Sequence, residues 1–290
     1  MDYTLRATAG NGQIRAFASI TTDMVEKSRT FHETSKVATA ALGRTLTATS
    51  IMGLMMKNEG DKVSVIIRGG GPLGTILTTS DSKGIVKGYV QNPQVVVEDY
   101  ENGKLNVAAA VGTNGVVTVI KDLGLREPYN GAYPLVSGEI AEDFTHYFAL
   151  SEQTPSIVAL GVLTSEYEVS NAGGLIIQLL PDATEETIEK LENNIANLSS
   201  ITTMLSEGKS PEDMLNIALE GLNHKILDKI DVKFECDCSK ERVGEVLISI
   251  GKKSLTEIIE EDKGAEVGCQ FCNVKYNYSE DELKKFLDEM

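Results

Sequence analysis

Four cysteines near the end of this 290-residue chain have the spacing of a metal site. They occur as Cys236-x-Cys238 and Cys269-x-x-Cys272, with thirty residues between the two pairs. Structural zinc takes four soft ligands at the corners of a tetrahedron, and two short pairs of thiolates supply such a set. The sequence therefore predicts one zinc ion per chain, bound by all four cysteines.

The residues around each pair indicate how the sulfur atoms converge. An extended strand over Glu235–Ser239 would direct the sulfurs of Cys236 and Cys238 to one face. Cys269 and Cys272 have the ordinary spacing of a zinc knuckle. Because thiolates are also the form of cysteine that oxidants attack, the site can be structural or can act as a redox sensor.

Residues 232–290 are expected to form a small C-terminal domain around this site. Ser239, Ser254 and Ser279 each begin a helix-start pattern, and Val274–Tyr278 reads as a strand. A core of this size scarcely outweighs chain entropy, so bound metal should supply much of the folding free energy. Removing zinc should unfold the domain.

Residues 1–180 are expected to form an α+β core that is mainly β-sheet. Three Asn-Gly pairs suggest hairpin turns between β-rich runs, and Asp61–Ile67 alternates as a strand does. Helices are predicted over Thr22–Thr30 and Ser35–Met56; the second contains Arg44 near its middle, which favours a helix buried in protein over a membrane span. The glycine-rich run Arg68–Gly74 lacks a P-loop ending and is predicted to be a tight turn between strands. The Asn-Gly pairs are Asn11-Gly12, Asn102-Gly103 and Asn114-Gly115.

Residues 181–231 are predicted to be an acidic helical linker. Apolar residues recur on one helical face, and Ser210-Pro211-Glu212-Asp213 is a helix-start pattern. The linker could be a solvated surface element or a connector docked by its apolar stripe onto a partner surface, and both interpretations remain open. The stripe consists of Ile188, Leu191, Ile195 and Leu198.

The charge distribution limits the partners. The net charge is −16, and residues 181–232 hold 4 basic against 11 acidic residues, while residues 233–290 hold 9 against 14. Such a field repels phosphate backbones, which argues against nucleic acid as the main partner. The start of the chain lacks an export signal and the cysteines have metal rather than disulfide spacing, so a cytoplasmic protein without a membrane partner is expected.

No constellation of residues resembles a catalytic site, so we expect no enzyme. His32, His146 and His224 are scattered, and none lies in a nucleophile or metal motif. Four thiolates already complete the zinc shell, so His224 is not needed as a ligand.

The whole chain resembles the family of the redox-regulated 33-kilodalton chaperonin, a heat-shock holdase of the bacterial cytosol. One departure is Lys36, where members often have proline. It leaves open the residue at which the helix predicted over Ser35–Met56 begins. The shared segments, besides the two cysteine pairs, are Thr39–Thr45 (TAALGRT), Gly69–Gly74 (GGGPLG), Val111–Gly115 (VGTNG), Val136–Ile140 (VSGEI), Ser151–Ser156 (SEQTPS) and Ala172–Gln178 (AGGLIIQ).

The resemblance implies a chaperone core, a linker and a C-terminal redox switch. It implies that the reduced, zinc-bound protein is inactive, and that under oxidative stress Cys236 pairs with Cys238 and Cys269 with Cys272 as zinc leaves. The switch and linker then unfold, the protein forms a homodimer, and it holds unfolding client proteins without ATP. Two other classes were weighed, a zinc-ribbon nucleic-acid binder and a thiol-disulfide oxidoreductase. The first would need a basic face, and the second would place its Cys-x-x-Cys at a helix start.

Overall fold

The small-residue segment predicted to be a buried helix is α2, Lys36–Leu54, in which every residue except Lys36 and Arg44 is buried. The helix begins at Lys36 despite the missing proline, because the Ser35 hydroxyl accepts a hydrogen bond from the Ala38 amide. Glycines let neighbouring strands approach this helix: a Cβ on Gly53 would lie 2.3 Å from the Asp81 carbonyl oxygen. The predicted helix and its buried position are confirmed.

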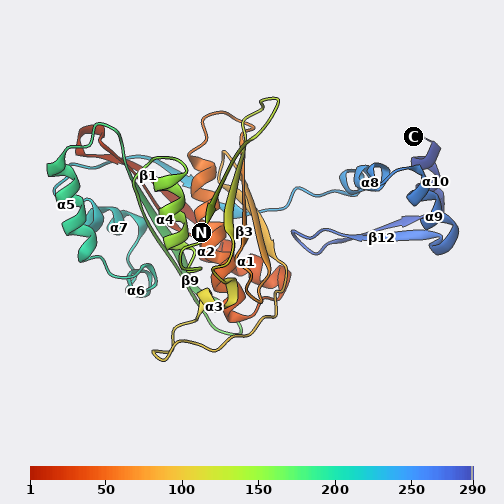
Figure 1. Cartoon of the computed structure of the whole chain (residues 1–290), viewed down its shortest axis with the longest axis horizontal. Helices are drawn as coiled ribbons and strands as arrows, with labels where there is room; N and C mark the ends of the chain where they lie inside the picture. The colour runs from red at the N-terminus through yellow and green to blue at the C-terminus, as the bar shows by residue number, and fades with distance from the viewer. Residues whose placement is uncertain (289) are drawn as a thin grey trace. The chain divides into compact units, whose positions relative to one another are not determined.

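This computed structural model describes residues 1–288 and 290, which form two compact units, Met1–Glu235 and Cys236–Met290 (Figure 1). The first unit contains two sheets, and α2 contacts strands of both. The first sheet has the order β10-β1-β2-β9-β8, with bounds Lys225–Asp231, Tyr3–Ala9, Ile14–Ile20, Val169–Leu179 and Ser156–Thr164. The second has the order β11-β5-β4-β3-β6-β7, with bounds Lys233–Phe234, Ile85–Val90, Thr75–Asp81, Lys62–Arg68, Val116–Asp122 and Tyr129–Pro134.

Six further α-helices of the first unit surround these sheets. Helix α1 packs against α2 and β9, and α4 against β8. Helices α6 and α7 lie on the first sheet, where α6 contacts β8 and β9 and α7 contacts β1 and β2 (Figure 1). Their bounds are Thr22–His32 for α1, Val107–Val111 for α3, Ala141–Leu150 for α4, Glu185–Ala196 for α5, Ile201–Ser206 for α6 and Pro211–Ala218 for α7, and a short 3-10 turn, η1, covers Gly10–Gly12.

The turn predictions had mixed outcomes. Asn11-Gly12 joins β1 to β2 as predicted, with positive φ at both residues, and Arg68 pairs with Thr75 across the glycine-rich turn. Asn102-Gly103 and Asn114-Gly115 do not form hairpins: the first lies in a loop before α3, and the second connects α3 to β6. A Cβ on Gly115 would lie 1.7 Å from the Arg68 carbonyl oxygen, so this glycine permits backbone contact rather than a type I′ turn.

The segment predicted as a helical linker contains three helices and then a strand. Ser210 caps α7 with Pro211 at its first position and Asp213 completing a capping box, as predicted. Residues Lys225–Asp231 instead form β10, which pairs antiparallel with β1. The sequence analysis missed this strand because Asp228, Lys229 and Asp231 interrupt its apolar pattern.

The second unit has a hairpin and three helices. Its strands are β12, Gly264–Gly268, and β13, Lys275–Ser279, and its helices are α8, Lys240–Ser249, α9, Lys252–Asp262, and α10, Glu280–Asp288. Ser239 caps α8, and Ser279 caps α10 by accepting from the Glu282 amide, as predicted. Ser254 was wrongly assigned as a cap, because α9 already begins after Gly251 and contains it.

Candidate metal centre

The four cysteines lie on two loops of the second unit. Cys236 and Cys238 precede α8, in a segment without regular strand pairing, so the strand expected there is absent from this described stretch. Cys269 and Cys272 lie in the turn that joins β12 to β13. That turn is closed by the amides of Cys272 and Asn273, which both donate to the Cys269 carbonyl oxygen.

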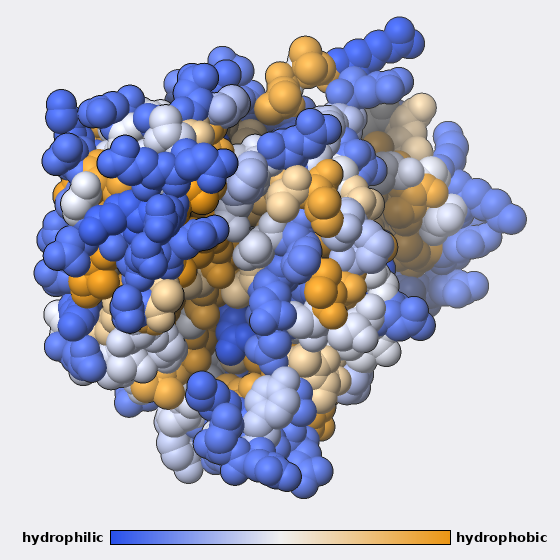
Figure 2. Space-filling model, turned by 60° about the vertical axis from the view of Figure 1, so that its left-hand side comes forward, coloured by the Kyte–Doolittle hydropathy of each residue, from blue (hydrophilic) through white to orange (hydrophobic). Residues whose placement is uncertain are grey.

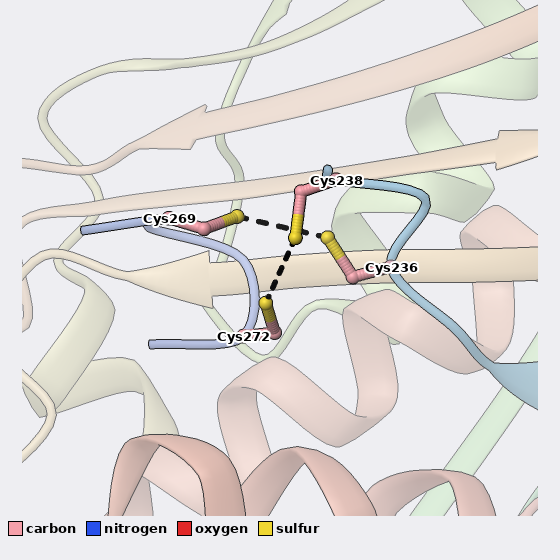
Figure 3. A group of neighbouring side chains, drawn as sticks. All are labelled: Cys236, Cys238, Cys269 and Cys272. Atoms are coloured by element: carbon pink, nitrogen blue, oxygen red, sulfur yellow. Dashed lines mark hydrogen bonds between the residues drawn. The ribbon is translucent and has the colours of Figure 1, made fainter. Parts of the chain in front are cut away.

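The four sulfur atoms converge (Figure 3). All lie within 4.8 Å of one another, and all four thiols are free. The Sγ atoms of Cys236 and Cys269 are 3.6 Å apart, and those of Cys238 and Cys272 are 3.4 Å apart. Four sulfurs bound at ~2.3 Å to one tetrahedral ion would be about 3.8 Å apart, whereas a disulfide needs ~2.05 Å. The spacing therefore fits a metal ion with four thiolate ligands, and zinc suits this donor set.

Neighbouring side chains hold the loop that contains Cys236 and Cys238. The Tyr276 hydroxyl, on β13, donates a hydrogen bond to Cys238 Sγ over 3.1 Å. Arg242 of α8 pairs with the Asp237 carboxylate between the two cysteines. A donor aimed at a ligand sulfur orients it and stabilises the thiolate, so Tyr276 supports the cluster from outside.

The acidities of the thiols show why a cation is needed. Burial raises the pKa of Cys236, and it raises the pKa of Cys272 to about 11. Burial also acts to raise the pKa of Cys238, but hydrogen bonds from Tyr276 and the neighbouring thiols outweigh it and lower that pKa. Four thiolates so close together would repel one another, and a bound dication removes that penalty.

The histidines take no part in this cluster. Among the described residues, the four cysteines form the one group of metal-ligand side chains that converges in this way. His32 is buried and its Nε2 donates to the Gly88 carbonyl oxygen, while His146 is exposed on α4. His224, weighed as a stray ligand, lies in the first unit just before β10.

The core of the second unit is small. Only five described residues are buried in its hydrophobic cluster, with partly buried side chains around them. The Tyr278 hydroxyl donates to the Lys240 carbonyl oxygen over 2.5 Å, and Lys240 pairs with Glu282, so contacts tie α8 to β13 and α10. So small a core contributes little folding free energy, and a metal ion held by the four cysteines would add to the stability of the unit. The five residues are Leu247, Leu255, Ile259, Tyr278 and Leu283.

A second feature lies in the first unit, where helices α5–α7 cover an apolar face of the first sheet. We call the sheet side of this contact the covered face: Leu5, Ala7, Ala9, Ile14, Ala16, Ala18, Leu175 and Ile177. Leu191 is 1% exposed against it, Ile195 and Leu198 pack around it, and the fully buried Met214 and Leu215 come from α7. Leu191, Ile195 and Leu198 of the apolar stripe are therefore docked on the chain's own core. This differs from both interpretations of the linker, because the stripe is not left in solvent and the surface it occupies belongs to the same chain.

The outer surface on this side is mainly polar. Figure 2 turns the side that carries α5 and α7 toward the viewer, and there hydrophilic residues predominate with hydrophobic ones in small separate groups. No helix among the described residues is long and apolar enough to cross a membrane. On this side of the first unit, the apolar residues of the covered face lie under the helices rather than on the outer surface.

The chain thus combines an α+β core, which has a covered apolar sheet face, with a small unit in which four cysteines could hold a metal ion. The comparisons identify the family. The model of the family described as Hsp33 protein matches residues 2–279, and the chain belongs to the Hsp33 family. This membership supports a chaperone role, which means binding unfolded client proteins.

Individual relatives match along nearly their whole length. The 33 kDa chaperonin of Clostridioides difficile is 75% identical over 289 residues, covering 100% of this chain and 99% of the relative. That of Alkaliphilus metalliredigens is 54% identical over 287 residues, covering 99% and 98%. The crystal structure of the 33 kDa chaperonin from Thermotoga maritima superposes with a TM-score of 0.92 at 34% identity, covering 99% of this chain and 98% of that one.

Proposed function

We propose that this protein is a cytoplasmic, redox-regulated and ATP-independent holdase, inactive while reduced and zinc-bound. The observation that carries the proposal is the convergence of four sulfurs within 4.8 Å on a unit with so small a core. Zinc held by Cys236, Cys238, Cys269 and Cys272 would keep four thiolates together and stabilise the folded unit. The domain boundaries proposed for this function are 1–180 for the core, 181–231 for the linker and 232–290 for the switch.

Oxidation at sulfur would start the activation. Each pair of thiolates gives two electrons to one hydrogen peroxide, which takes up two protons from solvent and leaves as two waters, and one S–S bond forms. We propose the pairs Cys236 with Cys238 and Cys269 with Cys272, because the short intervals keep each of these partners at high effective concentration. Disulfides remove the ligands that zinc requires, so the unit loses its main source of stability.

Exposure of the covered face would follow. Residues 181–232 carry 4 basic and 11 acidic residues, so the helices over this face repel one another electrostatically. Without a folded second unit, the helices would separate from the sheet and bare apolar side chains of the kind that bind unfolded proteins. The activated chain would then form a homodimer and hold clients.

The two other classes gain no support from a specific observation. The Cys269-x-x-Cys272 pair lies in a hairpin turn, whereas an oxidoreductase would place it at a helix start. The acidic balance of residues 233–290 is unsuited to nucleic acid. We propose no catalytic residues and no nucleic-acid or membrane partner.

A direct assay tests this function. Reduced protein, and protein treated with peroxide at mild heat, are each added to a thermally unfolding client, and aggregation is followed by light scattering. We expect only the treated protein to suppress scattering, and dithiothreitol with zinc to reverse the effect. Equal suppression by both samples, or none by either, would contradict the proposal.

A further inference from the structure

Strand β10 forms the outer edge of the first sheet and conceals the edge of β1. The two strands pair antiparallel from Tyr3 opposite Asp231 to Thr8 opposite Lys225. Strand β1 also supplies Leu5, Ala7 and Ala9 to the covered face. The edge of β1 and the covered face are therefore adjoining parts of one surface, and the segment 181–231 conceals both.

Several side chains of β10 pack poorly against β1 at the edge of the first sheet. Lys229 lies opposite Leu5, the register shifts between Arg6 and Ala7, and Leu227 is 54% exposed. The ion pair between Arg6 and Asp228 is partly exposed on both sides, and such surface pairs contribute little. Main-chain hydrogen bonds thus provide much of what holds β10 in place, together with Ile230, which packs partly buried against the main core, and the ring contact in which Lys229 Nζ lies 3.7 Å from the centre of Tyr3.

If β10 left the sheet, the open edge of β1 would become a binding site for an extended chain. A sheet edge presents a row of N–H and C=O groups that pair with any extended chain, whatever its sequence. Because successive residues of that chain point to opposite faces, alternate side chains would extend the covered face. An apolar residue opposite Leu5 would fit better than Lys229 does.

We propose that the edge of β1 is a client-binding site, to which an extended apolar segment of an unfolded protein adds as an antiparallel strand. In the reduced protein, β10 occupies this site as an internal competitor. The inference rests on the proposed function, because it needs the segment 181–231 to leave. It adds to that function the surface, the main-chain mode of recognition and the kind of segment recognised.

Peptides of the β10 sequence test the main-chain mode. Activated protein is loaded with a fluorescent unfolded client, and a synthetic peptide of residues 225–231 is added while client release is followed by anisotropy. We expect release by this peptide, and release at lower concentration by the Lys229→Val peptide. Potency that is unchanged or reduced by Lys229→Val would contradict the apolar preference.

Two N-methylated peptides provide the matched control. One carries methyl groups on the amides of Asp228 and Ile230, and the other on those of Lys229 and Asp231, so composition and charge are the same. Because successive amides of a strand point to opposite sides, only one of the two should lose its potency. Equal potency of both peptides, or release by none of the peptides, would overturn strand addition.

Hydrogen exchange of the β1 amides locates the site in the full-length protein. We expect protection of residues 3–9 in the reduced protein, loss of protection after peroxide and heat at the alternate amides that point to β10, and renewed protection of those amides with bound client; the amides paired with β2 should stay protected throughout. Renewed protection before client is added would show that a second copy of the chain occupies the edge and would overturn the proposal. A client held while the amides that point to β10 stay unprotected would refute this inference alone, whereas failure to hold any client would refute the proposed function itself.

Discussion

The rings of Phe31 and Phe234 meet edge to face, with centroids 5.7 Å apart and an interplanar angle of 64°. Phe234 is fully buried, and the next amide, that of Glu235, donates to the Val86 carbonyl oxygen over 3.0 Å. Only Glu235 separates this anchored side chain from Cys236, the first predicted metal ligand. The metal-binding unit therefore begins two residues after this anchored side chain, and five residues after Asp231, the last residue of β10.

Zinc content is the first prediction. Freshly reduced protein should contain one zinc per chain by elemental analysis, because four thiolates close one tetrahedral shell. Cys238→Ser should weaken zinc binding more than Tyr276→Phe, which removes only the hydrogen bond to that sulfur and should cost about 10- to 100-fold at most. Reduced protein without zinc, or equal losses in the two variants, would rule out the four-thiolate site.

Disulfide connectivity is the second prediction. Peptide mapping after peroxide and heat should find Cys236 joined to Cys238 and Cys269 joined to Cys272, because the short intervals keep each of these partners at high effective concentration. The shortest sulfur contacts of the folded cluster run instead between the pairs, at 3.6 Å and 3.4 Å. Crossed disulfides as the main product would show that these contacts decide the pairing, and would contradict the proposed connectivity.

The third prediction concerns the helices over the covered face. Leu191 is 1% exposed there, so Leu191→Asp forces a charge into an apolar contact at a cost of several kcal/mol. The reduced variant should suppress client aggregation without oxidant while zinc remains bound, and the half-buried Ile195→Asp should act in the same direction more weakly. Asn193→Asp places the same charge at an exposed position of α5 and serves as the control.

This prediction is checked by light scattering and zinc analysis in one sample. Circular dichroism establishes that the helices have melted in the Leu191→Asp protein. A melted but inactive Leu191→Asp protein, or activity in Asn193→Asp equal to that of Leu191→Asp, would show that the helices do not control client binding.

The features that could be predicted from the sequence are those set by residues close together in the chain. The ligand set Cys236, Cys238, Cys269 and Cys272 follows from spacing alone, and the caps at Ser210 and Ser279 follow from residue type and the acid three positions later. The strand predicted over Asp61–Ile67 is observed as β3, Lys62–Arg68, because its alternation has one buried face. Such signals lie within a few residues of one another.

Features set by distant contacts were missed. Strand β10 forms because β1, more than two hundred residues away, offers an edge, and its charged residues conceal this in the sequence. Asn114-Gly115 has the composition of a hairpin turn, but Gly115 is required by the nearby Arg68 backbone. The support that Tyr276 gives to Cys238 depends on the hairpin folding beside the first loop, and its only sequence signal is an aromatic residue shortly after the second knuckle.

The fourth prediction concerns Asp2, whose carboxylate accepts hydrogen bonds from the Asp23 and Met24 amides. Burial raises the pKa of Asp2 to about 6, and Asp23 adds to this, while the two backbone bonds and the N-terminal amine oppose it. The folded state thus binds this proton more tightly than the unfolded chain. The contribution of Asp2 to the free energy of unfolding therefore rises as pH falls from about 7 toward 4, and is lost as pH rises through 6.

Urea unfolding at pH 7 and pH 5 measures this contribution. From pH 7 to pH 5, the free energy of unfolding of the parent should rise by on the order of 1–2 kcal/mol more than that of Asp2→Asn, since one pKa unit corresponds to about 1.4 kcal/mol. Protonation of the cysteines affects both proteins equally and cancels in the comparison. Identical pH dependence in the two proteins would show that Asp2 is not the titrating group.

The most direct test follows zinc release and client holding together in one sample. Reduced, zinc-loaded protein is exposed to peroxide at mild heat with a zinc-sensitive dye, and portions taken over time are assayed for suppression of client aggregation. The account predicts that one zinc per chain is released and that holdase activity rises in step with it or after it, with both reversed by reductant and zinc. Full activity while zinc remains bound, or complete zinc release with two disulfides and no activity, would contradict the account.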